Sequence, residues 1–120
     1  MTNQDLLAMQ CGHATIALTD TQINAYLATI PGWAMAAGKL CKTFSVNNYY
    51  ENLAFFNACA LVFHADDHHP ETHLSYNRCS FAFDTHSVNE GRGGISINDF
   101  ICAAKVDALF NVATKNTASK

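Results

Sequence analysis

The segment from His64 to His73, with the sequence HADDHHPETH, contains four of the six histidines in the chain and three acidic residues. Histidine is the side chain whose ordinary pKa lies nearest to neutral pH, so it can donate and accept a proton in one reaction cycle, and its neutral form binds transition metals. Three roles are therefore open for this segment: a proton-transfer site, a metal site, or only the polar end of a helix.

The backbone of the segment disfavours a metal site. His64 and His68 have the i,i+4 spacing that places two ligands on one face of a helix, and Asp67 or His73 would be available to complete the site. However, Pro70 disfavours helical geometry at the residue before it, so the helix must end there and the pair would straddle its end. We therefore expect no metal.

Solvated histidines at a helix end are the simplest alternative, because the helix dipole favours their positive form at the C-terminus. This explanation suits His64 and His73. It suits His68 and His69 less well, because Pro70 fixes the backbone that presents these two side chains.

The hydrophobic pattern defines the elements that must position the segment. A capping-box spacing begins the first helix, Pro31-Gly32 ends it, and Ala37-Gly38 provides the turn of a hairpin. The expected elements are a helix at 19–30, strands at 33–35 and 40–46, a helix from 47 or 48 to about 66, strands at 74–76 and 79–84, and a helix at 96–108.

This order predicts an α+β fold. Strands joined by short turns are antiparallel, so we expect a four-stranded antiparallel sheet with three helices packed on one face, in the order α-β-β-α-β-β-α. The 120 residues are expected to form one domain. Its ends, at about 1–14 and 115–120, show no apolar period and are expected to be loosely held.

The body of the second helix has apolar side chains on two stripes, and a helix that rests on a sheet needs only one. The second stripe therefore indicates another covering surface, either a helix of the same chain or a partner subunit, and we expect a homodimer or homotetramer. The first stripe is Leu53, Phe56, Ala60 and Phe63, and the second is Phe55, Cys59 and Val62.

Composition excludes several classes of protein. The formal charge of −3 offers no electrostatic basis for binding nucleic acid or an anionic membrane. The longest apolar run, Ala58 to Phe63, is too short to span a bilayer, and no signal peptide is recognisable. The five cysteines are odd in number and never in C-x-x-C spacing, which favours reduced thiols and a cytoplasmic location.

The chain resembles the pterin-4a-carbinolamine dehydratase family, also known as the dimerisation cofactor of a homeodomain transcription factor. The resemblance extends from about residue 18 to 110 and includes the Pro-Gly-Trp33 step and the aromatic-rich second helix. Its most specific motifs are Asp67-His-His-Pro-Glu71, Tyr76-Asn-Arg78, Thr85-His86 and the run from Gly93 to Leu109.

The resemblance implies the same sheet with three helices, association as dimers or tetramers, and a pterin site at the two histidine motifs. Asp67 and Asp99 are candidates for a supporting role. The binding residues that the resemblance implies are His68, His69, Pro70, Thr85, His86, Ser87 and Val88.

The implied reaction converts 4a-hydroxytetrahydrobiopterin to quinonoid dihydropterin and water, which recycles the cofactor used by aromatic amino acid hydroxylases. Hydroxide leaves poorly, so an acid must protonate it while a base removes a ring N–H proton, and two imidazoles suit both tasks. We expect His68 and His86 to transfer protons and His69 to orient or polarise the substrate. Which histidine is the acid stays open, and no metal or organic cofactor is required.

Three departures from the family are visible. His64-Ala65 stands where many relatives have Glu-Lys, and Asp66 or Asp67 would have to replace that acid. The segment from Asn89 to Arg92 is extra and is expected to border the site. Thr72 stands where an aromatic residue often follows Pro-Glu.

Two other functions share these features. The chain could act mainly as a non-enzymatic scaffold for a transcription-factor dimer, although a scaffold does not require His68, His69 and His86. It could also be a dehydratase-like pterin protein of folate or molybdopterin metabolism.

Overall fold

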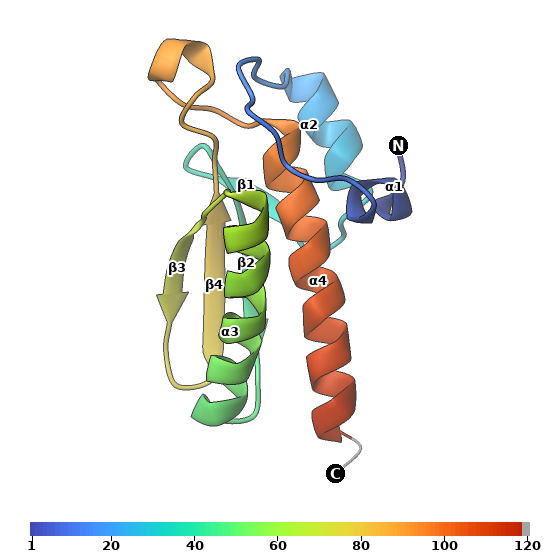
Figure 1. Ribbon diagram of the computed structural model, residues 1–120, viewed down its shortest axis with the longest axis vertical. Coiled ribbons are helices and arrows are strands. Elements are labelled where there is room, and N and C mark those ends of the chain that lie inside the picture. The colour runs from blue at the N-terminus through green and yellow to red at the C-terminus, as the bar shows by residue number, and fades with distance from the viewer. Residues whose placement is uncertain (119–120) are drawn as a thin grey trace.

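The computed structural model describes the backbone of residues 1–118 and the side chains of residues 1–112. Within this range, four strands form one antiparallel sheet in the order β1-β2-β4-β3. Two hairpins, β1-β2 and β3-β4, pair with each other through the central strands β2 and β4 (Figure 1). The strands are β1 (Ala34–Ala36), β2 (Lys39–Ser45), β3 (Glu71–Leu74) and β4 (Arg78–Phe83).

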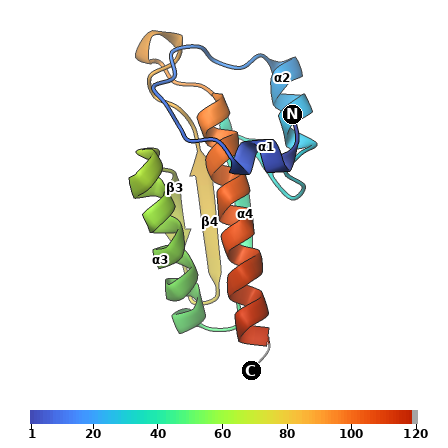
Figure 2. The same cartoon turned by 45° about the vertical axis from the view of Figure 1, so that its right-hand side comes forward.

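The two long helices lie side by side over one face of the sheet in both views (Figure 1, Figure 2). A shorter helix, α2, packs on α4, where Tyr26 stacks on Phe100 with 5.1 Å between the ring centroids. The predicted α+β fold with a four-stranded antiparallel sheet is confirmed. The helices are α1 (Asn3–Leu7), α2 (Asp20–Leu27), α3 (Tyr49–Asp66), α4 (Ile97–Ala118) and a short 3-10 turn, η1 (Asn89–Gly91).

Alternate residues of the central strands build the core on the helical side of the sheet. Phe44 of β2 and Phe81 of β4 lie 6.1 Å apart between ring centroids, and Phe55 of α3 packs on Phe44 at 5.1 Å. The opposite face carries small polar side chains, such as Thr43 and Ser80, whose hydroxyl oxygens are 2.8 Å apart. The sheet therefore has one apolar and one polar face, as strict alternation requires.

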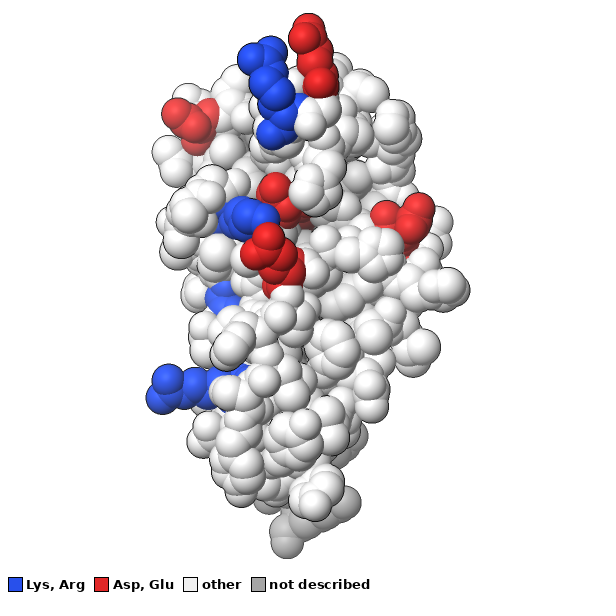
Figure 3. Space-filling model, turned by 90° about the vertical axis from the view of Figure 1, so that its left-hand side faces the viewer, with Lys and Arg blue, Asp and Glu red and all other residues white. Residues whose placement is uncertain are grey.

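Charged side chains are few on the β3 side of the molecule, where Figure 3 shows both signs intermixed. Lys39 of β2 lies 2.8 Å from Glu71 of β3 and 3.7 Å from Asp84, which follows β4. These ion pairs connect three parts of the polar face, and Asp84 also reaches the pocket described below.

Most of the capping and turn motifs in the sequence form the structures predicted for them. Thr19 and Gln22 form the capping box of α2, and the side chain of Asn48 caps α3 by accepting from the Glu51 N–H at 2.8 Å. The first hairpin turns at Ala37 and Gly38, which have φ angles of 50° and 78°.

Two elements, β3 and α4, have bounds that differ from the prediction. The strand β3 begins at Glu71, directly after Pro70, and it ends at Leu74 because the Ser75 N–H closes the following turn by donating to the Arg78 carbonyl at 3.0 Å. The helix α4 continues to Ala118 instead of ending near 108, and Phe110 extends its apolar face onto Phe44 at 4.8 Å. No helix in residues 1–118 is long and apolar enough to cross a bilayer.

The N-terminal segment differs from the loosely held end that was expected over 1–14. Thr2 and Asp5 form a capping box for α1, and Leu6 is fully buried in the core. A single five-residue helix has too few residues to display a period, so the pattern could not reveal this anchor. At the other end, residues 115–118 are helical, and the expectation for 119–120 lies outside the described residues.

The apolar stripes on α3 divide differently from the prediction. Phe55, Cys59 and Phe63 form one buried face, with exposures of at most 5%. Phe55 therefore belongs to the core and not to a subunit contact. The exposed apolar side chains of α3 lie on the other face, where Tyr50 is 80% and Leu61 is 73% exposed.

Candidate active site

The end of α3 turns the histidine motif back toward the core. Asp67 adopts the left-handed conformation, with φ 49° and ψ 46°, and the N–H of His68 donates to the Phe63 carbonyl at 3.1 Å. This reversal buries His68, which is 9% exposed, and leaves His69 on the surface. The two neighbouring histidines therefore occupy different environments.

His68 is held by a buried carboxylate. Its Nε2 lies 2.6 Å from Oδ1 of Asp99, and Asp99 has no exposed surface. The imidazole ring also stacks on Phe83, with 6.0 Å between centroids and 9° between planes. Because a carboxylate only accepts hydrogen bonds, Nε2 carries the proton, and Nδ1 is the nitrogen left to exchange protons with a ligand.

Asp99 is fixed by two further donors on its other oxygen. The Thr85 hydroxyl and the Ser96 N–H each donate to Oδ2 at 2.9 Å. Since the Thr85 hydrogen points to Asp99, the Ser96 hydroxyl must donate to Thr85, at 2.7 Å. The end of β4 and the start of α4 thus hold the carboxylate in one orientation.

The electrostatic balance at His68 favours its protonated form. Burial alone would lower the pKa of His68, but the hydrogen bond and the negative charge of Asp99 outweigh burial, and the pKa of His68 is raised above its ordinary value. A histidine that is held in one orientation and can exchange a proton has the properties of a general acid or base.

The pocket beside this pair has a volume of about 500 Å³. It lies between the end of α3, the segment after β4, the start of α4 and the chain between α1 and α2. Its lining residues are Cys11, Gly12, His13, Ala14, Asp66, Asp67, His68, His69, Asp84, Thr85, His86, Ser87 and Asn98.

The structure brings most of the predicted site residues to this one pocket. His68, His69, Thr85, His86 and Ser87 all line it, although they come from two separate motifs. The candidate supporting residues are also close: Asp67 lines the pocket and Asp99 lies behind His68.

Two predicted binding residues lie elsewhere. Val88 is fully buried, and Pro70 is half-buried outside the pocket lining. The extra segment that was expected to border the site also lies apart from the lining. It forms η1, at the tip drawn in light orange in Figure 1, where Asn89 and Glu90 have φ angles of 54° and 58°.

His86 is much freer than His68. Its side chain is 87% exposed, and its closest charged neighbour is Asp84, with 3.8 Å between Nε2 and Oδ1. His69 is exposed as well. These two imidazoles can change rotamer to meet a bound molecule, whereas His68 cannot.

One wall of the pocket was missed by the sequence prediction. Asn98 holds this wall by accepting from the Gly12 N–H at 3.2 Å and donating to the Gly12 carbonyl at 2.6 Å, and the Ser87 hydroxyl donates to the Ala14 carbonyl. The wall lies before residue 18, where the family resemblance begins, and it has no regular structure. The polar Cys11-Gly12-His13 sequence was the one feature of this segment that could have indicated a wall of the pocket.

Candidate metal ligands converge at one place in the described side chains, and of the segment from His64 to His73 only Asp66 takes part. One ligand atom from each of Cys11, Asp66 and Cys102 falls within 4.8 Å of the other two, and no histidine belongs to this group. The cluster adjoins the pocket, because Cys11 and Asp66 both line it.

Comparisons with known proteins agree with this geometry. Residues 16–109 match the family model for pterin 4 alpha carbinolamine dehydratase. A protein from Bdellovibrio bacteriovorus, named for pterin-4-alpha-carbinolamine dehydratase, is 50% identical over 109 residues, which cover 91% of each chain. A protein from Nitrosospira multiformis with the same name is 40% identical and covers 92% of this chain and 97% of its own.

A solved structure shares the fold. The crystal structure of a transcriptional coactivator/pterin dehydratase from Brucella melitensis superposes with a TM-score of 0.70 at 29% identity, covering 78% of this chain and 97% of that one. With a family model that spans most of the chain and relatives that match it almost end to end, the chain belongs to the pterin-4a-carbinolamine dehydratase family.

Proposed function

We propose that this protein is a hydro-lyase that dehydrates 4a-hydroxytetrahydropterin to quinonoid dihydropterin. The observation that carries the proposal is a pre-oriented histidine, His68, whose ring is held by the buried Asp99 at the wall of an open pocket. The names of the relatives from Bdellovibrio and Nitrosospira support the same activity.

The reaction moves two protons and breaks one carbon–oxygen bond. The hydroxyl on carbon 4a accepts a proton and leaves as water, while a ring N–H loses a proton and its electrons form the new carbon–nitrogen double bond. No electrons are gained or lost overall. The protein must therefore supply one acid and one base, placed on the two reacting atoms.

His68 and His86 are the proposed proton-transfer residues. Nδ1 of His68 would face the substrate, since Nε2 is bonded to Asp99, and Asp99 would act as a positioning residue that stabilises the imidazolium. His86 would approach the substrate from the segment after β4. His69 would approach from the turn after α3 and would orient or polarise the substrate. Proton transfer by a positioned side chain contributes about 10²–10⁴-fold to a rate.

The setting proposed for this activity is the recycling of tetrahydrobiopterin after an aromatic amino acid hydroxylase, in the cytoplasm. All five cysteines are free thiols, which supports a reducing compartment. We also propose that dehydration needs no metal or organic cofactor, because imidazoles can perform both proton transfers. Assembly as a homodimer or homotetramer is part of the same proposal.

A coactivator role is the second candidate, and it is favoured by the similarity to the Brucella protein, a transcriptional coactivator/pterin dehydratase. A scaffold, however, gains nothing from an imidazole–carboxylate pair beside an open pocket. A pterin of folate or molybdopterin metabolism is the alternative substrate class, and offering such pterins in the same assay separates it from the biopterin reaction.

The deciding experiment is a dehydration assay on freshly generated 4a-hydroxytetrahydropterin, with and without a chelator. We expect the wild-type protein to accelerate dehydration equally in both conditions. His64→Ala is the matched control, because His64 is exposed on the last turn of α3 and does not line the pocket. No acceleration over buffer would refute the enzymatic proposal, and loss on chelation that zinc reverses would refute its metal-free chemistry.

A further inference from the structure

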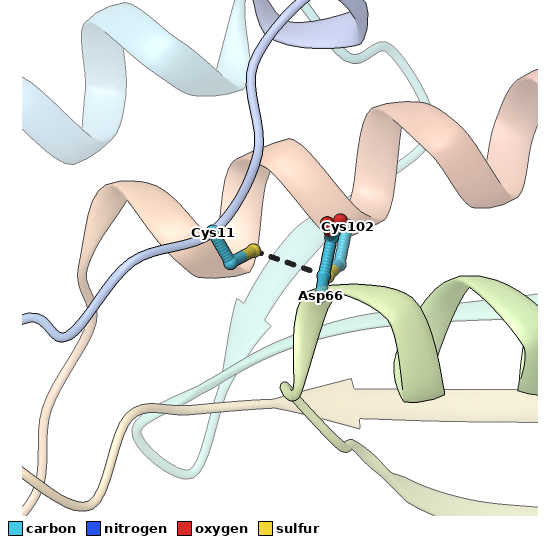
Figure 4. A group of neighbouring side chains, drawn as sticks. All are labelled: Cys11, Asp66 and Cys102. Carbon is cyan, nitrogen blue, oxygen red and sulfur yellow. Dashed lines mark hydrogen bonds between the residues drawn. The ribbon is translucent and has the colours of Figure 1, made fainter.

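Two cysteines and a carboxylate meet where three segments of the chain converge (Figure 4). Cys11 lies in the chain between α1 and α2, Asp66 is the last residue of α3, and Cys102 lies on α4. The two sulfur atoms are 3.5 Å apart. They are separated by most of the chain in sequence, so the fold alone brings them together.

The spacing of the ligand atoms suits a tetrahedral soft metal ion. Two sulfurs bound at ~2.3 Å to a tetrahedral zinc ion lie about 3.8 Å apart, close to the observed 3.5 Å. The carboxylate oxygen of Asp66 falls within the same 4.8 Å group, so it provides a third ligand without rearrangement of the backbone. Thiolates together with a carboxylate favour zinc over magnesium or calcium, which prefer sites made only of oxygen.

The charge at the cluster is balanced both with and without an ion. Asp66 lies 2.6 Å from Lys105, and its side chain is only 3% exposed. With both thiols protonated, the carboxylate and the ammonium cancel. With a divalent ion and two thiolates added, the net charge is again zero, so binding would create no uncompensated buried charge.

The cluster is also accessible to an ion. Cys11 is half-buried and lines the pocket together with Asp66, whereas Cys102 is fully buried behind them. An ion could therefore enter from the pocket, which would also supply water as a fourth ligand.

We propose that Cys11, Asp66 and Cys102 form a zinc-class metal site beside the pterin pocket. The ion would join the N-terminal wall of the pocket to the end of α3 and to α4. Its role is structural, and dehydration should proceed at the same rate with and without the ion, because the hydrogen bonds of Asn98 and Ser87 already hold this wall. The site does not rest on the proposed dehydratase activity.

Zinc binding to the fully reduced protein tests the site, with cadmium as a spectroscopic probe of thiolate coordination. We expect one ion per chain, a cadmium–thiolate charge-transfer band in the ultraviolet, and release of about two protons per ion, because both thiols must ionise. Cys11→Ser should lower zinc affinity more than about 100-fold, since loss of even an outer-shell partner costs 10–100-fold. Cys41→Ser is the matched control, because Cys41 is also half-buried but lies on β2.

The histidines provide the main alternative ligands, and the design separates them. His68→Ala should retain the bound ion and the charge-transfer band even if it abolishes dehydration. Cys102→Ser should lose both, with circular dichroism to verify that the buried substitution still folds. Binding that survives Cys11→Ser, or that releases no protons, would show adventitious histidine coordination and overturn the proposal, as would the absence of binding to the reduced protein.

Discussion

The two sides of the proposed pterin pocket are built differently. On one side, His68 is bonded to Asp99, and Asp99 is fixed by the Thr85 hydroxyl and by the backbone N–H of Ser96, directly before α4. On the other side, His86 is almost fully exposed, and its Nε2 lies 3.8 Å from Oδ1 of Asp84. The first side is organised before a ligand arrives, and we expect the second to become organised only when a ligand is present.

This difference assigns different tasks to residues of the same type. A buried imidazole with a fixed carboxylate has a set tautomer and a pKa tuned by its partner. An exposed imidazole adapts its position but gives up pre-organisation, which lowers its contribution in the free enzyme. The catalytic effects of removing the two histidines should therefore be unequal.

Removal of His68 should have the largest effect. We expect His68→Ala to slow dehydration by about 10²–10³-fold, because it removes the pre-oriented proton-transfer group and leaves Asp99 without its partner. Single-turnover kinetics on freshly generated substrate would measure the loss, and circular dichroism would verify folding. A rate within twofold of wild type would contradict the larger catalytic role expected for the pre-organised side of the pocket.

Neutralising the carboxylate should affect the pH profile more than it affects substrate binding. Asp99→Asn removes the charge that raises the pKa of His68, so the His68 limb of the pH–rate profile should move to lower pH. The direction is the same whether His68 is the acid or the base. A limb at an unchanged pH, in a variant that is folded, would show that Asp99 only fills space.

Removal of His86 should have a smaller effect. We expect His86→Ala to slow dehydration at least about tenfold, through loss of proton transfer alone. His73→Ala is the matched control, because His73 is an exposed histidine of β3 that does not line the pocket. If the control were the more damaging substitution, the assignment of the second proton-transfer group would be wrong.

The sequence could predict those parts of the fold that follow from periodic apolar residues or from local motifs. Alternation placed Phe81 and Phe83 on one face of β4, and the proline in the histidine motif located the end of α3. Only the family resemblance predicted that the motifs of His68 and Thr85 would meet at one site. Each of these signals depends on residues close together in sequence.

The parts that could not be predicted depend on contacts between distant segments. Asn98 holds Gly12 across most of the chain, and no periodic pattern marks either residue. Asp99 was predicted as a candidate supporting residue, but its bond to His68 requires the register of α4 against α3. The stripes of α3 were misassigned because an apolar helix of this composition has no single apolar face in its sequence.

The two faces of α3 extend the comparison from the pocket to assembly. Phe55 is 1% exposed in the core, so Phe55→Glu would bury a charge and should unfold the chain.

Leu61 is 73% exposed on the opposite face, together with Tyr50, and burial of apolar surface there yields about 25 cal/mol per Å². We therefore expect Leu61→Glu to weaken a homodimer or homotetramer while leaving the fold and the rate per site within about twofold, because His68 and His86 come from one chain. Light scattering at micromolar concentration would measure the assembly. A wild-type protein that is monomeric there, or an oligomer that Leu61→Glu leaves intact, would remove this face of α3 from the interface and leave the assignment of the pocket unchanged.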